Sequence, residues 1–136
     1  MDATVETKIW LALKSRIATL GMNIPVLMPA EKHIQPTTEY IRVGRVTTDP
    51  NRVLIANGKK YERTGFLMLT LVSPLHSNIE VFDNKAGKIA MHFADGKSMQ
   101  YGDVCVTVTS YPHVVDGYED GNYWNTPVRI PWRCFA

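Results

Sequence analysis

Residues that could carry acid–base or metal chemistry are spread thinly through this sequence. Its histidines lie far apart, at His33, His76, His92 and His113. No HxH, HExxH, CxxC, GxSxG, P-loop or GxGxxG motif is present. The best candidate for a cation site is one stretch with nitrogen and oxygen ligands: His113, Asp116, Glu119 and Asp120. The glycines and aromatics around it indicate a mobile loop, and its spacing is not that of an EF-hand. We therefore expect no metal site, no cofactor and no catalytic residue.

Basic residues gather around a predicted hairpin near the middle of the chain. They are opposed locally only by Asp49 and Glu62, and they comprise Arg42, Arg45, Arg52, Lys59, Lys60 and Arg63. Such a cluster can contact nucleic-acid phosphates or an acidic protein surface, or can simply be solvated. No RNP-like, helix-turn-helix or zinc-finger pattern accompanies it, so sequence-specific nucleic-acid binding is not expected. We predict electrostatic docking on an acidic protein surface through Arg52, Lys59, Lys60 and Arg63.

Aromatic residues concentrate in residues 111–125, which also carry glycines and acids. Aromatics in such a loop can stack sugars or bases, supply contact area at a protein interface, or fold over the protein's own core. We rank the last two readings equally and sugar binding below them. The length of the loop favours a contact arm that becomes ordered on assembly. Its predicted interface residues are Tyr118, Tyr123 and Trp124; if the arm packs on its own domain, Trp124 is the expected plug.

A long strand is predicted from Tyr61 to Val72, and it must position the basic cluster and the aromatic loop. Leu67, Leu69 and Leu71 share one face, as the two-residue period of a strand requires. The opposite face carries Phe66, Met68, Thr70 and Val72. A strand that is apolar on both faces needs cover on both. We expect the protein's own helices on one face and a partner on the other, with Phe66 and Met68 in the interface. Upstream, Asn57-Gly58 predicts a tight hairpin.

Two amphipathic helices are predicted around this strand. The first spans residues 3–20, with Asp2 as its cap and Gly21 after its end. The second begins at the capping box Ser77-x-x-Glu80 and runs to about Phe93. Its buried face is expected to comprise Ile79, Phe82, Ala86, Ile89, Ala90 and Phe93. Gly87 inside it suggests a close crossing with a neighbour.

The remaining apolar segments alternate as strands do. They are expected at Val26–Met28, Glu39–Val46, Ser98–Tyr101, Asp103–Thr109 and Thr126–Phe135. In the last strand, Val128, Ile130, Trp132 and Cys134 face inward. Pro127 and Pro131 lie on its other face and predict a sheet edge. The order of elements predicts an α+β fold: a mostly antiparallel sheet with two helices packed on one side and long loop arms.

Composition bounds the remaining possibilities. The chain has 136 residues and 45% hydrophobic content, which fits one domain (1–136). Its formal net charge of +2 is too small to argue for binding to nucleic acid or to an anionic membrane. Cys105 and Cys134 are expected to be buried thiols in a reducing compartment. The N-terminus lacks the pattern of a signal peptide, and no segment has the length and apolarity of a membrane span.

The order of several motifs resembles the small tail terminator, or tail-completion, proteins of long-tailed bacteriophages. The motifs are Thr38-Glu39-Tyr40-Ile41-Arg42-Val43, Gly65 opening the long strand, Ile89-Ala90-Met91-His92-Phe93, and Trp124-Asn125-Thr126-Pro127-Val128-Arg129-Ile130-Pro131-Trp132. The N-terminal helix and the proline-broken arm precede them. The likeness covers nearly the whole chain as a pattern more than as a signature.

This resemblance implies a structural virion protein with no catalysis and no cofactor. It implies a hexameric ring at the head-proximal end of the tail tube, which ends tube polymerisation and joins the tail to the head. The implied partners are other copies of the chain, the tail tube protein and head-completion or connector proteins. The implied location is the virion tail, after assembly in the host cytoplasm. The alternatives are another ring-forming tail or connector protein, or a small carbohydrate- or nucleic-acid-binding module; an enzyme ranks third.

Overall fold

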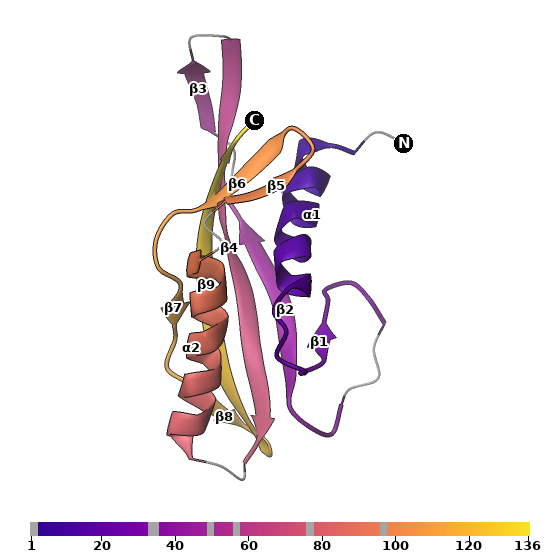
Figure 1. Cartoon of the computed structure of the whole chain (residues 1–136), viewed down its shortest axis with the longest axis vertical. Coiled ribbons are helices and arrows are strands. Elements are labelled where there is room, and N and C mark those ends of the chain that lie inside the picture. Colours follow the sequence, from indigo (N-terminus) through magenta and orange to yellow (C-terminus); the bar gives the residue numbers. More distant parts are fainter. Residues whose placement is uncertain (1–2, 33–35, 49–50, 56–57, 76–77, 96–97) are drawn as a thin grey trace.

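The computed structural model describes residues 3–32, 36–48, 51–55, 58–75, 78–95 and 98–136, with the backbone alone for 51–55, 58–60 and 95. In this part of the chain, two helices and nine strands form an α+β fold (Figure 1). The helices are α1 (Val5–Ala18) and α2 (Ile79–Asp95). The strands are β1 (Val26–Leu27), β2 (Tyr40–Thr47), β3 (Asn51–Ile55), β4 (Gly58–Pro74), β5 (Ser98–Tyr101), β6 (Val104–Val108), β7 (His113–Val114), β8 (Tyr118–Asp120) and β9 (Tyr123–Phe135).

The sheet is built around β4, which pairs antiparallel with β2 on one side and with β9 on the other. Along the main path the order is β1-β2-β4-β9-β6-β5, and only the pairing of β1 with β2 is parallel. The predicted hairpin is present as β3 and the first part of β4. It projects beyond the end of the sheet (Figure 1). The Asn57 position of its turn lies outside the described residues.

The prediction that the last strand lies at a sheet edge is wrong. β9 pairs with β4 from Tyr123 to Phe135 and meets β6, β7 and β8 on its other side. The carbonyls of Pro131 and Pro127 accept from the N–H groups of Thr109 and Val115 on that other side. The N–H and C=O of a strand residue point the same way. Both prolines therefore turn their missing N–H away from β4, and the long β4–β9 ladder is left intact.

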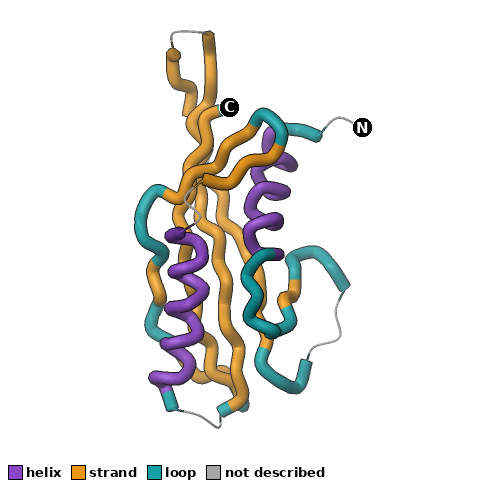
Figure 2. The backbone as a smooth tube through the Cα atoms, in the orientation of Figure 1, coloured by secondary structure: helices purple, strands orange, loops and turns teal. Residues whose placement is uncertain are grey.

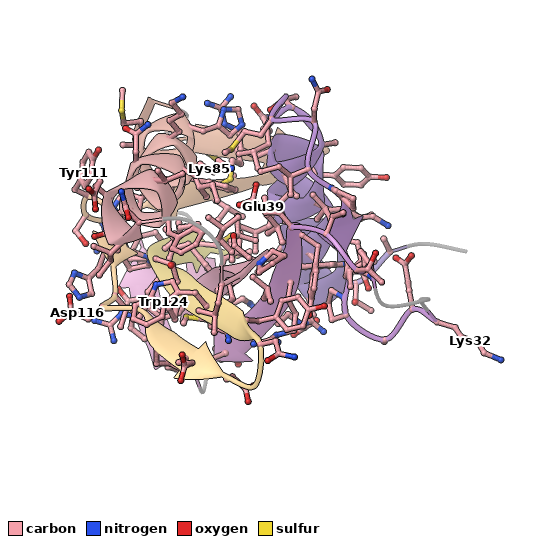
Figure 3. The ribbon with its side chains drawn as sticks, turned by 90° about the horizontal axis from the view of Figure 1, so that it is seen from below. Lys32, Glu39, Lys85, Tyr111, Asp116 and Trp124 are labelled. Carbon is pink, nitrogen blue, oxygen red and sulfur yellow. The ribbon has the colours of Figure 1, made fainter. Side chains whose placement is uncertain are left out.

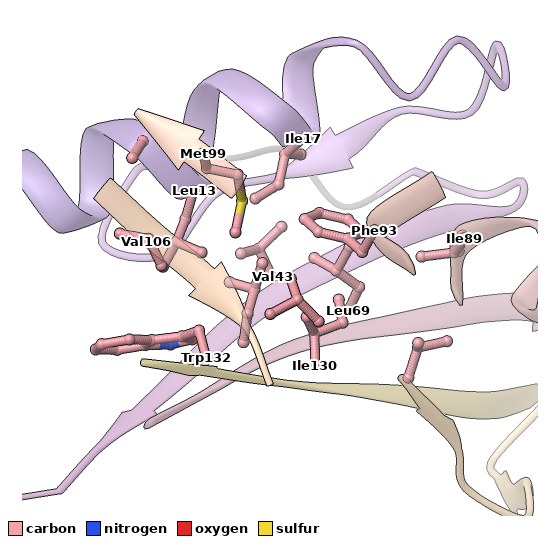
Figure 4. Close-up of a cluster of buried hydrophobic side chains, with 14 of the residues drawn as sticks. Leu13, Ile17, Val43, Leu69, Ile89, Phe93, Met99, Val106, Ile130 and Trp132 are labelled. Atoms are coloured by element: carbon pink, nitrogen blue, oxygen red, sulfur yellow. The ribbon is translucent and has the colours of Figure 1, made fainter. Parts of the chain in front are cut away.

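Both helices cover the same face of the curled sheet, as predicted (Figure 2). The buried core between them contains Leu67, Leu69 and Leu71, all 0% exposed, and Val128 and Ile130 from β9. Leu13 and Ile17 of α1 and Phe93 of α2 close this core from the helix side (Figure 4). The alternation seen in the sequence thus selects the inner face of the sheet correctly.

The helix ends differ from the sequence predictions. The side chain of Thr4, three residues before Thr7, accepts from the Thr7 N–H at 3.3 Å and caps α1; Asp2, the predicted cap, lies outside the described residues. Ser77 of the predicted capping box also lies outside them. Ile79 is 53% exposed, so it is not part of the buried face of α2, because it stands in the first turn, beyond the end of the core. A Cβ on Gly87 would meet nothing within 4 Å, so this glycine does not mark a close crossing.

A close approach exists instead at Gly65, where β4 enters the core. A Cβ there would lie 2.4 Å from the Val46 carbonyl oxygen and 2.7 Å from the Trp132 ring. Every other residue type carries a Cβ, so the Trp132 ring can lie against this backbone only if the residue is glycine. Gly65 therefore fixes how the indole of β9 is seated under α1.

The cysteine prediction is half right. Cys134 is buried on the inner face of β9, but Cys105 is exposed. Val104 and Val106 take the inner positions of β6, and the two-residue period of a strand turns Cys105 outward. No helix in the described part of the chain is both long and apolar enough to cross a membrane.

Candidate interaction surfaces

The face of the sheet opposite the helices carries a mixed apolar and basic patch. The strand registers align Val46, Phe66 and Pro131 in one row and Gly44, Met68 and Arg129 in the next. We call the residues of these two rows, together with Arg42 in the next row, the open-face patch. Val46 is 55% exposed, and Phe66 and Met68 are half-buried. The two predicted interface residues of the long strand therefore sit side by side at the centre of an accessible surface.

Arginines border the apolar centre of the open-face patch. The Arg129 guanidinium lies over the Phe66 ring, 5.3 Å from its centroid. Arg42 and Arg129 are exposed, and none of the aligned positions of the patch is acidic. An apolar centre with a cationic border suits an apolar protein surface that carries carboxylates.

Farther along β4 the same face is closed. Thr70 is 7% and Val72 is 2% exposed, although both alternate with the inner leucines. The register partners of Val72 are Tyr40 and Asn125, and both are buried as well. Among the described residues, the outer face is thus accessible around Phe66 and Met68 and closed around Val72.

Residues 111–125 differ from the predicted structureless arm. They contain β7 and β8, and β9 begins at Tyr123. Val115 donates its N–H to the Pro127 carbonyl, and Leu75 donates to the Asn122 carbonyl. The segment is therefore ordered against its own sheet in the single chain. The tip of the β8–β9 hairpin remains exposed, with Gly121 at φ +60° in the turn.

Trp124 is the plug of this segment, as the alternative reading predicted. Its indole lies beneath α2 and beside the β8–β9 hairpin (Figure 3), in a groove shared with Leu75, Ile79 and Phe82. A Cβ on Gly117 would lie 2.3 Å from the indole Nε1, so that glycine permits the packing. Tyr118, by contrast, is 48% exposed. Of the predicted arm residues, Tyr118 offers the free aromatic ring, Tyr123 is half-buried, and Trp124 belongs mainly to the fold.

The basic hairpin separates into two parts. Arg52, Lys59 and Lys60 lie on the projecting strands β3 and β4, and their side chains lie outside what the structure describes. Arg63 has a different environment from the solvent-facing one that docking requires. Its guanidinium pairs with the Glu6 carboxylate of α1, and its side chain is 15% exposed. A hydrogen bond from the Glu6 backbone N–H, followed by the bond from Arg63, lowers the pKa of the Glu6 carboxyl.

Other partly buried polar contacts tie α2 to the sheet and α1 to α2. Glu39 accepts from Ser73 Oγ at 2.5 Å and from Lys85 Nζ at 2.8 Å (Figure 3). Arg16 of α1 donates to the His92 carbonyl, while His92 Nε2 lies 3.0 Å from the Arg16 carbonyl oxygen. These contacts are made within the fold, so we assign them to stability; Arg16 Nε is buried without a partner among the described residues.

Catalytic and metal-binding groups do not converge in the described residues. Among these, no three histidine, cysteine or acidic side chains gather in a way that could hold a metal ion. His113 and Asp116 are exposed at the outer edge of the sheet, and Glu119 and Asp120 are on the hairpin tip. His33 and His76 lie outside the described residues.

Sequence reasoning assigned Arg42 to the basic cluster around the hairpin and missed that Arg42 and Arg129 border the open-face patch. Alternation placed Arg129 outward, and Arg42 opposite Ile41, but only the strand order brings both beside Phe66 and Met68. A correct pairing of the last strand with the long strand would have revealed the patch.

Comparisons with known proteins agree with this architecture. A family model described as phage tail terminator protein matches residues 8–132. A solved structure whose description names no function is similar over 95% of this chain and 94% of its own, with a TM-score of 0.73 and 17% sequence identity. At that identity the likeness establishes the fold alone. No curated protein matches the chain.

The family match runs from α1 to β9 and covers most of the chain. It identifies a structural role in the phage tail, in agreement with surfaces suited to protein contact. This chain belongs to the phage tail terminator protein family.

Proposed function

We propose that this protein forms a closed ring, hexameric by analogy with its family, at the head-proximal end of the phage tail tube. The ring ends tube polymerisation and presents a surface to head-completion or connector proteins. It performs no catalysis and needs no cofactor.

The open-face patch is the observation that carries this proposal. Val46, Phe66 and Met68 leave apolar surface on strands whose other face carries the buried core under the helices. Burying such surface contributes about 25 cal/mol per Å² of apolar area. Arg42 and Arg129 beside it disfavour contact with an identical patch, because like charges would face each other. A different surface, on a neighbouring subunit or on the tube, is therefore the favoured partner.

The projecting β3–β4 hairpin supplies a second proposed contact. Its sequence carries Arg52, Lys59 and Lys60, and it extends beyond the sheet (Figure 1). A two-stranded hairpin without further cover is only marginally stable in water. We infer that it docks on an acidic surface of the tube or connector and gains its cover there.

The proposal is tested by replacing Phe66 and Met68 with glutamate together. Sedimentation velocity and negative-stain images of the protein, alone and with purified tail tubes, measure ring formation and tube capping. The double variant should lose rings and capped tubes, because two carboxylates would be buried against an apolar partner. Normal tube capping by this variant would contradict the placement of the patch in the interface.

Met91→Glu is the matched control. Met91 is 55% exposed on α2, on the helix side of the domain. It should assemble normally if the open-face patch is the contact. A wild-type protein that remains monomeric and caps no tube would overturn the ring proposal itself.

A second candidate, nucleic-acid binding without sequence selectivity, is favoured by the arginines stacked on aromatic rings: Arg129 over Phe66 and Arg133 over Phe135. Such binding would weaken steeply with salt. Mobility-shift assays with random duplex and single-stranded DNA, at low and at physiological salt, distinguish nucleic-acid binding from the proposed ring function. Tight binding at physiological salt would favour this candidate.

A further inference from the structure

A cavity of about 330 Å³ lies between α1 and the upper part of the sheet. Its apolar wall is formed by Ile9, Leu13 and Trp132. Its polar wall includes Arg45, Thr48 and the ion pair of Arg63 with Glu6. The Arg45 guanidinium lies over the Trp10 ring at 5.2 Å from its centroid and belongs to an exposed residue. The cavity is therefore apolar inside. Its border carries the neutral Arg63–Glu6 pair and the positive charge of Arg45.

Two buried N–H donors belong to residues that line this cavity. Trp132 is 3% exposed, and its Nε1 has no hydrogen-bond partner among the described residues. Arg63 Nε is likewise buried and without a partner there, although its NH1 pairs with Glu6. A buried donor without an acceptor costs about 1–3 kcal/mol. The complementary ligand should bring oxygen acceptors, negative charge and an apolar group.

The tip of the β8–β9 hairpin of this same chain has that chemistry. Tyr118 is 48% exposed, and Glu119 and Asp120 beside it are exposed as well. Gly121 closes the tight turn at φ +60°. The tip thus presents one aromatic ring and two carboxylates on a hairpin held by β9.

The tip cannot reach the cavity of its own chain. The β8–β9 hairpin and the first turn of α1 lie toward opposite ends of the long axis (Figure 1). A ring of more than two subunits requires two different, complementary surfaces on each subunit. A basic cavity near one end and an acidic tip at the other satisfy this requirement.

On the basis of the proposed ring, we propose that the β8–β9 tip of one subunit inserts into the cavity between α1 and the sheet of its neighbour. The carboxylates of Glu119 and Asp120 accept from Trp132 Nε1 and Arg63 Nε and pair with Arg45, while the NH1 of Arg63 stays with Glu6. Tyr118 contacts the wall made by Ile9 and Leu13. The occupant of the cavity is therefore a second copy of this chain.

Cysteine cross-linking between copies tests this placement. All variants carry Cys105→Ser, since Cys105 is the exposed natural thiol. One variant carries Thr48→Cys at the cavity, and a second, with a size tag, carries Asp120→Cys at the tip. The two are mixed, assembled alone or on tail tubes, and oxidised. A cross-linked dimer should form between the two variants, and none should form when Met91→Cys replaces Thr48→Cys.

Charge exchange tests the energetics independently. Arg45→Glu and Asp120→Arg should each raise the ring dissociation constant by at least about tenfold, because each places like charges across the contact. The double variant Arg45→Glu with Asp120→Arg should recover most of the loss. If Arg45→Glu does not fold, Glu119→Lys on the exposed tip replaces it, and this variant should also raise the ring dissociation constant.

The two proposals fail in different ways. Rings that form normally in all charge variants and give no cross-link would overturn the tip-in-cavity contact and leave the ring standing. A wild-type protein that forms no ring alone or on tubes would overturn both.

Discussion

The two faces of β4 differ in how completely this chain covers them. On the helix side, Leu67, Leu69 and Leu71 are each 0% exposed. On the other side, Phe66 and Met68 are half-buried, although they belong to the same strand and are equally apolar in sequence. The difference arises because both helices pack on one face of the sheet (Figure 2).

This asymmetry separates residues that fold the subunit from residues available for contact. The inner leucines contribute their transfer free energy once, when the chain folds. Phe66 and Met68 remain partly exposed after folding, so part of their transfer free energy is gained only when another molecule covers them. A family of tail terminator proteins, whose members act as parts of a larger particle, would be expected to retain such a surface.

The largest predicted effect contrasts neighbouring residues on the two faces. Leu69→Ala should lower the free energy of unfolding by about 2–5 kcal/mol, because it leaves a cavity in the closed core. Met68→Ala should cost under about 1.5 kcal/mol, because its side chain is only half covered. Urea denaturation of both variants, at a concentration where the protein is monomeric, measures the contrast. Equal losses would show that the outer face is as closed as the inner one.

A smaller effect is predicted for the backbone approach beneath Trp132. Gly65→Ala should destabilise by about 1–3 kcal/mol, since the added methyl meets the Val46 carbonyl and the indole. Gly87→Ala is its matched control, and it should stabilise α2 by about 1 kcal/mol because its Cβ enters open space. Thermal unfolding ranks the two. A neutral Gly65→Ala would mean that the Trp132 ring moves easily, and that the inner face is looser than its burial indicates.

The smallest effect on stability is predicted for the hairpin beyond the covered part of β4. Reversing Lys59 and Lys60 to glutamate should change the free energy of unfolding by under about 0.5 kcal/mol. It should slow head–tail joining and reduce the salt dependence of its rate, because charges at the border of an interface mainly steer association. Joining is followed by infectivity of mixtures of heads and tails. An unchanged joining rate would remove the hairpin from the docking surface.

Periodicity alone was enough to identify the inner face of the fold. Leu67, Leu69 and Leu71, and the alternating Val128 and Ile130, were assigned to the core correctly. The buried face of α2 from Phe82 to Phe93 was also predicted correctly. These features depend on residues close in sequence, where the two-residue and 3.6-residue periods determine which side chains share a face.

Only the tertiary structure decided which segments lie beside one another. Pro127 and Pro131 suggested an edge strand, but β9 is internal because the prolines face the short strands rather than β4. Residues 111–125 read as a free arm, yet their backbone groups pair with β9 and their Trp124 packs beneath α2. The sequence predicts Arg63 to be a surface cation, but its guanidinium pairs with Glu6 of α1. Each outcome depends on a partner distant in the sequence, and local periodicity carries no information about such a partner.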